Sequence, residues 1–178
     1  MIDVRMMKDN PQKNALSLIE SELHNLPDDA RLWIYQADEP FEEREGNVMK
    51  NEVDLFINGW QAHGKALAAA GSFLYNRFLI LGVDEKQAAA SGCSIDSSVA
   101  FVKEMEKKFG AEFFNRQILT YWKGDDIVQN PLSELPALHQ KGIVNDDSLV
   151  FNNLVSTPQQ MKREWILPLA ESWHKNFV

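Results

Sequence analysis

Residues 72–83 read SFLYNRFLILGV and indicate the sheet of this protein most clearly. Aromatic and β-branched residues dominate this stretch, so it predicts one long strand, or two strands broken near Asn76 and Arg77. Apolar and polar residues alternate over Arg31–Gln36, as expected of a half-buried strand. The apolar run at residues 149–155 predicts a further strand.

A hairpin and several helices accompany these strands. The hairpin is predicted around Gly124, where two apolar runs flank a short polar turn. Apolar residues at helical spacing predict helices over residues 11–24, 48–67 and 93–109, with two more after Pro131 and Thr157, the last one kinked or split at Pro168. This order of elements predicts an α+β fold, in which a mixed sheet with one hairpin has helices interleaved among its strands.

Length and composition predict one compact domain over residues 1–178, with residues 1–26 as an N-terminal helical extension. The chain has 178 residues, of which 44% are hydrophobic, and it contains 10 Phe and 5 Trp. That is enough apolar material for a sizeable core. No linker or repeat divides the sequence.

The net charge of −8 argues against partners that need a positive surface. Nucleic acids and anionic membranes are bound by clustered Lys and Arg, and the sequence has no such cluster. The one cysteine cannot form an internal disulfide, which fits a reducing compartment. Residues 1–10 contain no apolar signal segment, and residues 67–81 are interrupted well short of a membrane span. We therefore expect a cytoplasmic protein that binds neither nucleic acid nor membrane.

The predicted functional site is the start of the helix over residues 93–109. Small polar residues gather there, where the first N–H groups of a helix lack intrahelical partners. A helix start of this kind can hold an anion or lower the pKa of a thiol. With two polar residues from the 72–83 stretch, the predicted ligand-binding residues are Cys93, Ser94, Asp96, Ser97, Ser98, Asn76 and Arg77. Asp96 opposes an anion, so a neutral polar ligand is equally allowed, and helix capping is the simpler interpretation of the cluster.

Cys93 and His63 define an alternative, enzymatic interpretation. The thiol would be the nucleophile, and the imidazole, on the predicted helix over residues 48–67, would be its base. Asp96 opposes this chemistry because a nearby carboxylate raises the pKa of a thiol. The third interpretation is that Cys93 packs beneath the helix end, since free cysteine is among the most buried residue types.

The other polar residues predict no metal site and no cofactor. The four histidines are isolated in sequence from one another and from the cysteine, so no zinc-binding spacing exists. Arg77 can bind an anion, but pairing with one of the many acidic residues is the favoured interpretation. Asn152 and Asn153 indicate a strand end or bulge more than a ligand-binding amide pair.

The C-terminal region carries a heavy apolar load, with Trp165, Leu167, Trp173 and Phe177 close together. Core packing is the favoured interpretation of these residues. Any part left on the surface would form a homodimer or partner contact. A structural or assembly protein is therefore one of the functions that the sequence allows.

Residues 59–66, GWQAHGKA, imitate a phosphate-binding loop through their two glycines and their lysine. Such a loop needs a preceding strand, whereas the residues before Gly59 have helical spacing. Ala66 replaces the Ser or Thr whose hydroxyl would hold Mg²⁺, and Trp60 is bulky where the backbone must surround phosphates. We therefore expect no ATPase activity.

Six motifs carry a resemblance to a known family: WIYQ at 33–36, WQAHG at 60–64, YNRF at 75–78, GCSID at 92–96, VFNNLV at 150–155 and SWH at 172–174. In these motifs the chain resembles an uncharacterised bacterial family whose members sometimes carry the automated label "ABC transporter ATPase". The resemblance covers nearly the whole chain after about Leu26. It implies no particular activity, and Ala66 and the helical residues before Gly59 do not support the ATPase label.

These observations favour a small-ligand-binding or regulatory protein with a polar site at residues 93–98 and no cofactor. Its ligand would be small, and either polar or anionic. The alternatives are a thiol-dependent enzyme that uses Cys93 and His63, and a structural or assembly protein. A contact from His63 or Arg77 to Cys93 would distinguish between them.

Overall fold

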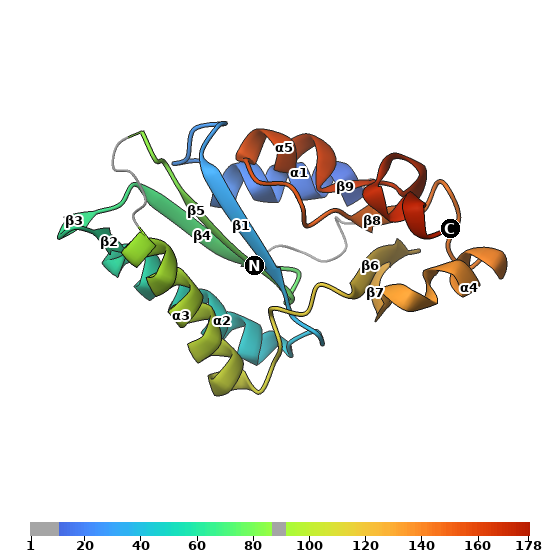
Figure 1. Ribbon diagram of the computed structural model, residues 1–178, viewed down its shortest axis with the longest axis horizontal. Coiled ribbons are helices and arrows are strands. Elements are labelled where there is room, and N and C mark those ends of the chain that lie inside the picture. The colour runs from blue at the N-terminus through green and yellow to red at the C-terminus, as the bar shows by residue number, and fades with distance from the viewer. Residues whose placement is uncertain (1–10, 87–91) are drawn as a thin grey trace.

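A three-stranded sheet, ordered β1-β5-β4, lies at the centre of the computed structural model, which describes residues 11–86 and 92–178 (Figure 1). Its strands are β1 (Arg31–Gln36), β4 (Ala69–Leu74) and β5 (Phe78–Val83). Residues 72–83 therefore belong to two strands, one of the two expected outcomes. The chain reverses at Tyr75 and Asn76, which both have a φ of 53°. All of β5 is buried, because it is paired on both edges and covered on both faces.

Helices cover both faces of this sheet (Figure 1). They are α1 (Pro11–Glu22), α2 (Glu43–Gly59), α3 (Gly92–Phe109) and α5 (Pro158–Glu164). Leu79 and Leu81 of β5 join the core under α2 and α3, whereas Phe78 and Ile80 join the core under α1 and α5. Fully burying a side chain of this size contributes about 1.5–3 kcal/mol, so β5 anchors both halves of the core.

A second sheet, ordered β7-β6-β8-β9, carries the C-terminal half of the chain. Its strands are β6 (Ile118–Lys123), β7 (Asp126–Pro131), β8 (Leu149–Phe151) and β9 (Ile166–Pro168). Short helical segments flank it: η2 (Leu132–Glu134), α4 (Leu135–Gln140), η3 (Leu169–Glu171) and η4 (Trp173–Phe177). The predicted hairpin around Gly124 is confirmed, since Lys123 pairs with Asp126 across a glycine with φ 63°.

These elements confirm the predicted α+β class. Among the described residues, the expected mixed sheet takes the form of three sheets, the third being β2 (Gln61–Ala62) with β3 (Lys65–Ala66). The paired strands in each sheet run antiparallel. Across residues 11–86 and 92–178, no helix is long and apolar enough to cross a membrane.

The expected helix over residues 48–67 is wrong at its C-terminal end. α2 stops at Gly59, and Trp60 leaves it in an extended conformation to become buried. The next residues form the β2–β3 hairpin, whose turn has φ 52° at His63 and 76° at Gly64. His63 therefore lies in a turn and not on a helix. The residues before Gly59 are helical, as predicted, whereas a phosphate-binding loop would need a strand there.

The C-terminal helix is also shorter than expected. Thr157 caps α5 by accepting a hydrogen bond from the Gln160 N–H at 3.2 Å, as predicted. The helix ends at Glu164 and does not continue to Pro168, which instead completes the strand β9. Because proline lacks an N–H and favours an extended residue before it, this segment pairs with β8.

Candidate functional site

The predicted site at the start of α3 lies only in part within the described residues. The helix begins at Gly92, so Cys93 opens it as expected, but the side chains of Cys93 and Ser94 lie outside the described part. Asp96 and Ser97 are exposed. Ser98 is buried, and its hydroxyl donates to the Ile95 carbonyl at 2.7 Å. The Ser98 hydroxyl is therefore used inside the helix.

Arg77 is buried and directed toward β7, not toward α3. Its guanidinium donates to the Ile127 carbonyl at 3.2 Å, to Gln129 Oε1 at 3.0 Å and to the Tyr75 carbonyl at 3.2 Å. The favoured salt bridge is wrong, since no described carboxylate lies within ion-pair distance of Arg77. Burial lowers the pKa of this guanidinium, and the nearby Glu39 acts in the opposite direction. Arg77 thus joins the central sheet to the second one.

Asn76 and His63 lie in the two tight turns of the N-terminal half. Asn76 packs against Gly46 of α2, where a side chain larger than hydrogen would collide with its amide. His63 is exposed in the β2–β3 turn, and β2 contacts α3. Because the Cys93 side chain lies outside the described residues, the thiol-enzyme interpretation stays a prediction.

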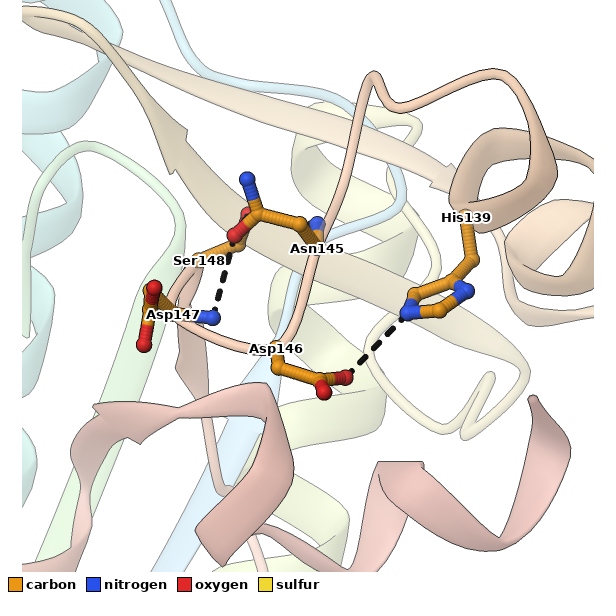
Figure 2. Close-up of polar contacts among 5 residues, drawn as sticks. All are labelled: His139, Asn145, Asp146, Asp147 and Ser148. Carbon is orange, nitrogen blue, oxygen red and sulfur yellow. Dashed lines mark hydrogen bonds and ion pairs between the residues drawn. The ribbon is translucent and has the colours of Figure 1, made fainter.

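A serine, a histidine and an aspartate lie close together at the end of α4 and in the loop after it, but they do not form a catalytic triad (Figure 2). His139 Nε2 lies 3.2 Å from Asp146 Oδ1. The Ser148 hydroxyl instead accepts from the Asn145 N–H at 2.9 Å and lies 3.3 Å from Asn145 Oδ1. Because a triad needs the histidine beside the serine, this cluster is a loop-stabilising network.

Among the described residues, no group of three His, Cys, Asp or Glu side chains is arranged to hold a metal ion.

His174 is buried and stacks on Trp173, with ring centroids 3.9 Å apart. Its Nδ1 lies 2.7 Å from the Ser172 hydroxyl. Burial lowers the pKa of His174 to about 4, so its imidazole is neutral at pH 7.

A cavity that was not predicted from sequence lies beside β1. It has a volume of about 430 Å³ and follows the outer edge of β1. Its walls come from residues 113–118, which lead from α3 into the first residue of β6, and from residues 153–156, which connect β8 to α5. Trp173, His174 and Phe177 of the C-terminal segment line it as well. We call this cavity the β1 groove.

A chain of oriented amides leads into the β1 groove. The Trp165 indole can only donate, and its Nε1–H donates to Asn153 Oδ1 at 3.0 Å. This contact directs the Asn153 amide NH₂ toward Gln36, whose Oε1 accepts from Nδ2 at 2.7 Å. Gln36 is 5% exposed, and its own NH₂ group finds no acceptor among the described residues. Gln36, which lines the groove, therefore carries a buried donor whose orientation is determined by its neighbours.

The opposite face of β1 lines the groove with aromatic side chains. Trp33 and Tyr35 are half-buried, and the Tyr35 ring meets Phe114 edge to face at 5.4 Å. Burial raises the pKa of the Tyr35 phenol, while the Arg116 guanidinium acts in the opposite direction. Arg116 is exposed at the groove, and no Asp or Glu lines it. The groove thus offers aromatic surface, hydrogen-bond donors and one positive charge.

No model of a known family, no curated protein and no solved structure matches this chain. The resemblance to the bacterial family therefore stays a prediction. What the protein does has to be inferred from the geometry of its own residues.

Proposed function

We propose that this protein is a binding protein whose ligand occupies the β1 groove through an acceptor group and an apolar part. The observation that supports this is the unpartnered Gln36 amide. A buried donor without an acceptor costs about 1–3 kcal/mol, and a ligand oxygen beside it would recover that free energy. Asn153 and Trp165 hold the amide in place through its carbonyl oxygen, which fixes the direction of its NH₂ group.

The size and lining of the β1 groove support the same function. Its volume of about 430 Å³ lies within the roughly 300–1,000 Å³ of typical ligand pockets. Half-buried aromatic residues and a few convergent donors are the usual composition of such pockets. Arg116, without an acidic neighbour in the lining, favours an anionic group on the ligand. The net charge of −8 makes nucleic acid an unfavourable ligand.

Catalysis in the groove is the less supported alternative. The pair near the groove that most resembles a nucleophile and its base is Ser172 and His174. Both residues are 1% exposed, so the Ser172 hydroxyl is out of reach of a substrate. The predicted helix-start site and the predicted homodimer remain secondary proposals. Phe177, 44% exposed at the groove, is the C-terminal aromatic residue most available to a partner.

Anilinonaphthalene sulfonate, an apolar probe with one negative charge, tests this function. We expect saturable binding of one molecule per chain, followed by its fluorescence. Leu154→Ala should weaken this binding about five-fold, because Leu154 lines the groove and loses roughly 1 kcal/mol of apolar contact.

Leu55→Ala is the matched control, since Leu55 is a similarly exposed leucine on α2 that does not line the groove. Its affinity for the probe should equal that of the parent chain. Unsaturable binding, or equal effects of the two substitutions, would contradict the proposed function.

A further inference from the structure

Along β1, the main-chain N–H and C=O groups of successive residues point alternately toward β5 and away from it. Every second residue therefore directs these groups into the groove. Leu32 N–H donates to the Ser156 carbonyl at 2.8 Å, and Asp38 N–H donates to the Glu112 carbonyl at 3.0 Å. Both bonds lie on the side of β1 away from β5. On β5, Asp84 N–H donates to Ala68, toward β4, so the odd-numbered residues of β5 are the ones bonded to β1.

The residues between these two end contacts have no partner on the outer side. By the same alternation, the N–H and C=O of Ile34 and Gln36 point away from β5 and into the groove. Within the described ranges, no residue hydrogen-bonds these four groups. The open edge runs from Leu32 to Gln36, which is about 13 Å of extended chain at roughly 3.3 Å per residue.

We infer that the occupant of the β1 groove is an extended peptide segment of a partner protein, which adds to β1 as a further strand. The inference rests on the proposed function and names its ligand class. An open strand edge is a template for another extended chain, and its main-chain groups supply much of the affinity. A peptide of about five residues fits the length between the two end contacts.

The side chains around the edge specify what the peptide carries. Alternate residues of an added strand point to opposite faces. On one face they meet Trp33, Tyr35 and Phe114, which select aromatic or other apolar side chains. On the other face they meet the unpartnered NH₂ of Gln36, which selects an oxygen acceptor. Arg116 and the absence of acids from the described lining favour a negatively charged peptide.

The test uses fluorescein-labelled, amidated pentapeptides and measures their binding by fluorescence polarisation. A peptide that alternates Glu and Phe should bind, and one that alternates Lys and Phe should bind at least ten-fold more weakly. Two further versions of the first peptide carry N-methyl groups, either on the Glu amides or on the Phe amides. Since only one set of amides faces β1, one version should lose binding at least ten-fold and the other should keep it.

Two substitutions place the peptide on the edge of β1. Ile34→Pro removes the outward N–H without breaking a main-chain bond to β5, and an edge strand tolerates proline. It also removes the half-buried Ile34 side chain from the core under α1 and α5. Gln36→Glu keeps the acceptor for Asn153 and replaces the donor with a charge that repels a carboxylate. Each should weaken the Glu-Phe peptide at least ten-fold. Ile34→Val keeps the outward N–H and should bind the peptide as the parent chain does.

Each other outcome overturns the inference. If neither peptide binds, or if both methylated versions bind equally, while the probe still binds, strand addition is wrong and the proposed function stands. If neither the peptide nor the probe binds, both are wrong. If the chain alone sediments as a dimer that Ile34→Pro dissociates, the occupant is a second copy of β1 and not a partner peptide.

Discussion

The start of α3 and the β1 groove both gather polar side chains, but they use them differently. At α3, the buried Ser98 hydroxyl bonds to a carbonyl three residues earlier in the same helix. At β1, the Gln36 amide is oriented by residues more than a hundred positions away and keeps a donor without a partner. Polar groups that are close in sequence satisfy one another, whereas groups held in place by tertiary contacts can remain available to a ligand.

The largest effect is expected where the oriented amides are broken. Asn153→Leu leaves the Trp165 N–H and Gln36 Oε1 without their partner, so the free energy of unfolding should fall by about 2–4 kcal/mol. Binding in the groove should fall with it. Urea denaturation measures the change in stability.

Asn152→Ala is the control for this loop, because the Asn152 side chain accepts only from the nearby Leu154 N–H. Asn152→Ala should lower the free energy of unfolding by only about 0.5–1 kcal/mol. If both substitutions lowered the free energy of unfolding equally, the hydrogen bonds from Trp165 through Asn153 would not be what holds Gln36 in place.

Arg77 should affect stability without affecting the groove. Arg77→Met removes two hydrogen bonds to β7 and one within the β4–β5 turn, and it leaves buried acceptors unpaired, so we expect a loss of about 2–3 kcal/mol. Probe affinity should be unchanged, because Arg77 does not line the groove. Arg163→Met, at an exposed arginine, is the control and should change stability by less than about 0.5 kcal/mol. A large loss of probe affinity in Arg77→Met would instead show that Arg77 contributes to ligand binding.

His174 should make the stability of the protein depend on pH. Its pKa is about 4 in the folded chain and 6.5 in the unfolded chain, so the unfolded chain binds more protons between these values. This contribution to stability is complete above pH 6.5 and is lost as the pH falls toward 4, with a loss of about 2 kcal/mol between pH 7 and pH 5.

His174→Gln removes the titrating group and is compared with the parent chain by urea denaturation at both pH values. Other groups titrate equally in the two chains, so the difference between their pH dependences reports on His174. Parallel pH dependences would show that His174 has an ordinary pKa.

The smallest effect is expected at Cys93. A helix start stabilises a nearby negative charge by about 0.3–1 kcal/mol when exposed, and Asp96 offsets this. Alkylation by iodoacetamide across pH should therefore give an apparent pKa at or above the 8.5 of a free cysteine. A value below about 7 that rises in His63→Ala would instead support the thiol-dependent enzyme.

Most of the helices and strands could be predicted because their signals are local. Arg31–Gln36 alternates with a period of two, and residues 93–109 have apolar side chains at helical spacing; both became the expected elements. The hairpin at Gly124 is specified by its turn residues. The expectation was wrong after Gly59, because burial of Trp60 ends α2 and the positive φ values of His63 and Gly64 turn the chain back.

The sequence by itself determined the α+β class, through periodicities that each segment carries within itself. It also determined where α3 begins, because small polar residues favour a helix start. Only the tertiary structure decided that Gln36, Asn153 and Trp165 meet, and that the outer edge of β1 stays open between Ser156 and Glu112. The physical reason is that hydrogen bonds and cavities between distant segments depend on how the elements pack, and no local pattern records that packing.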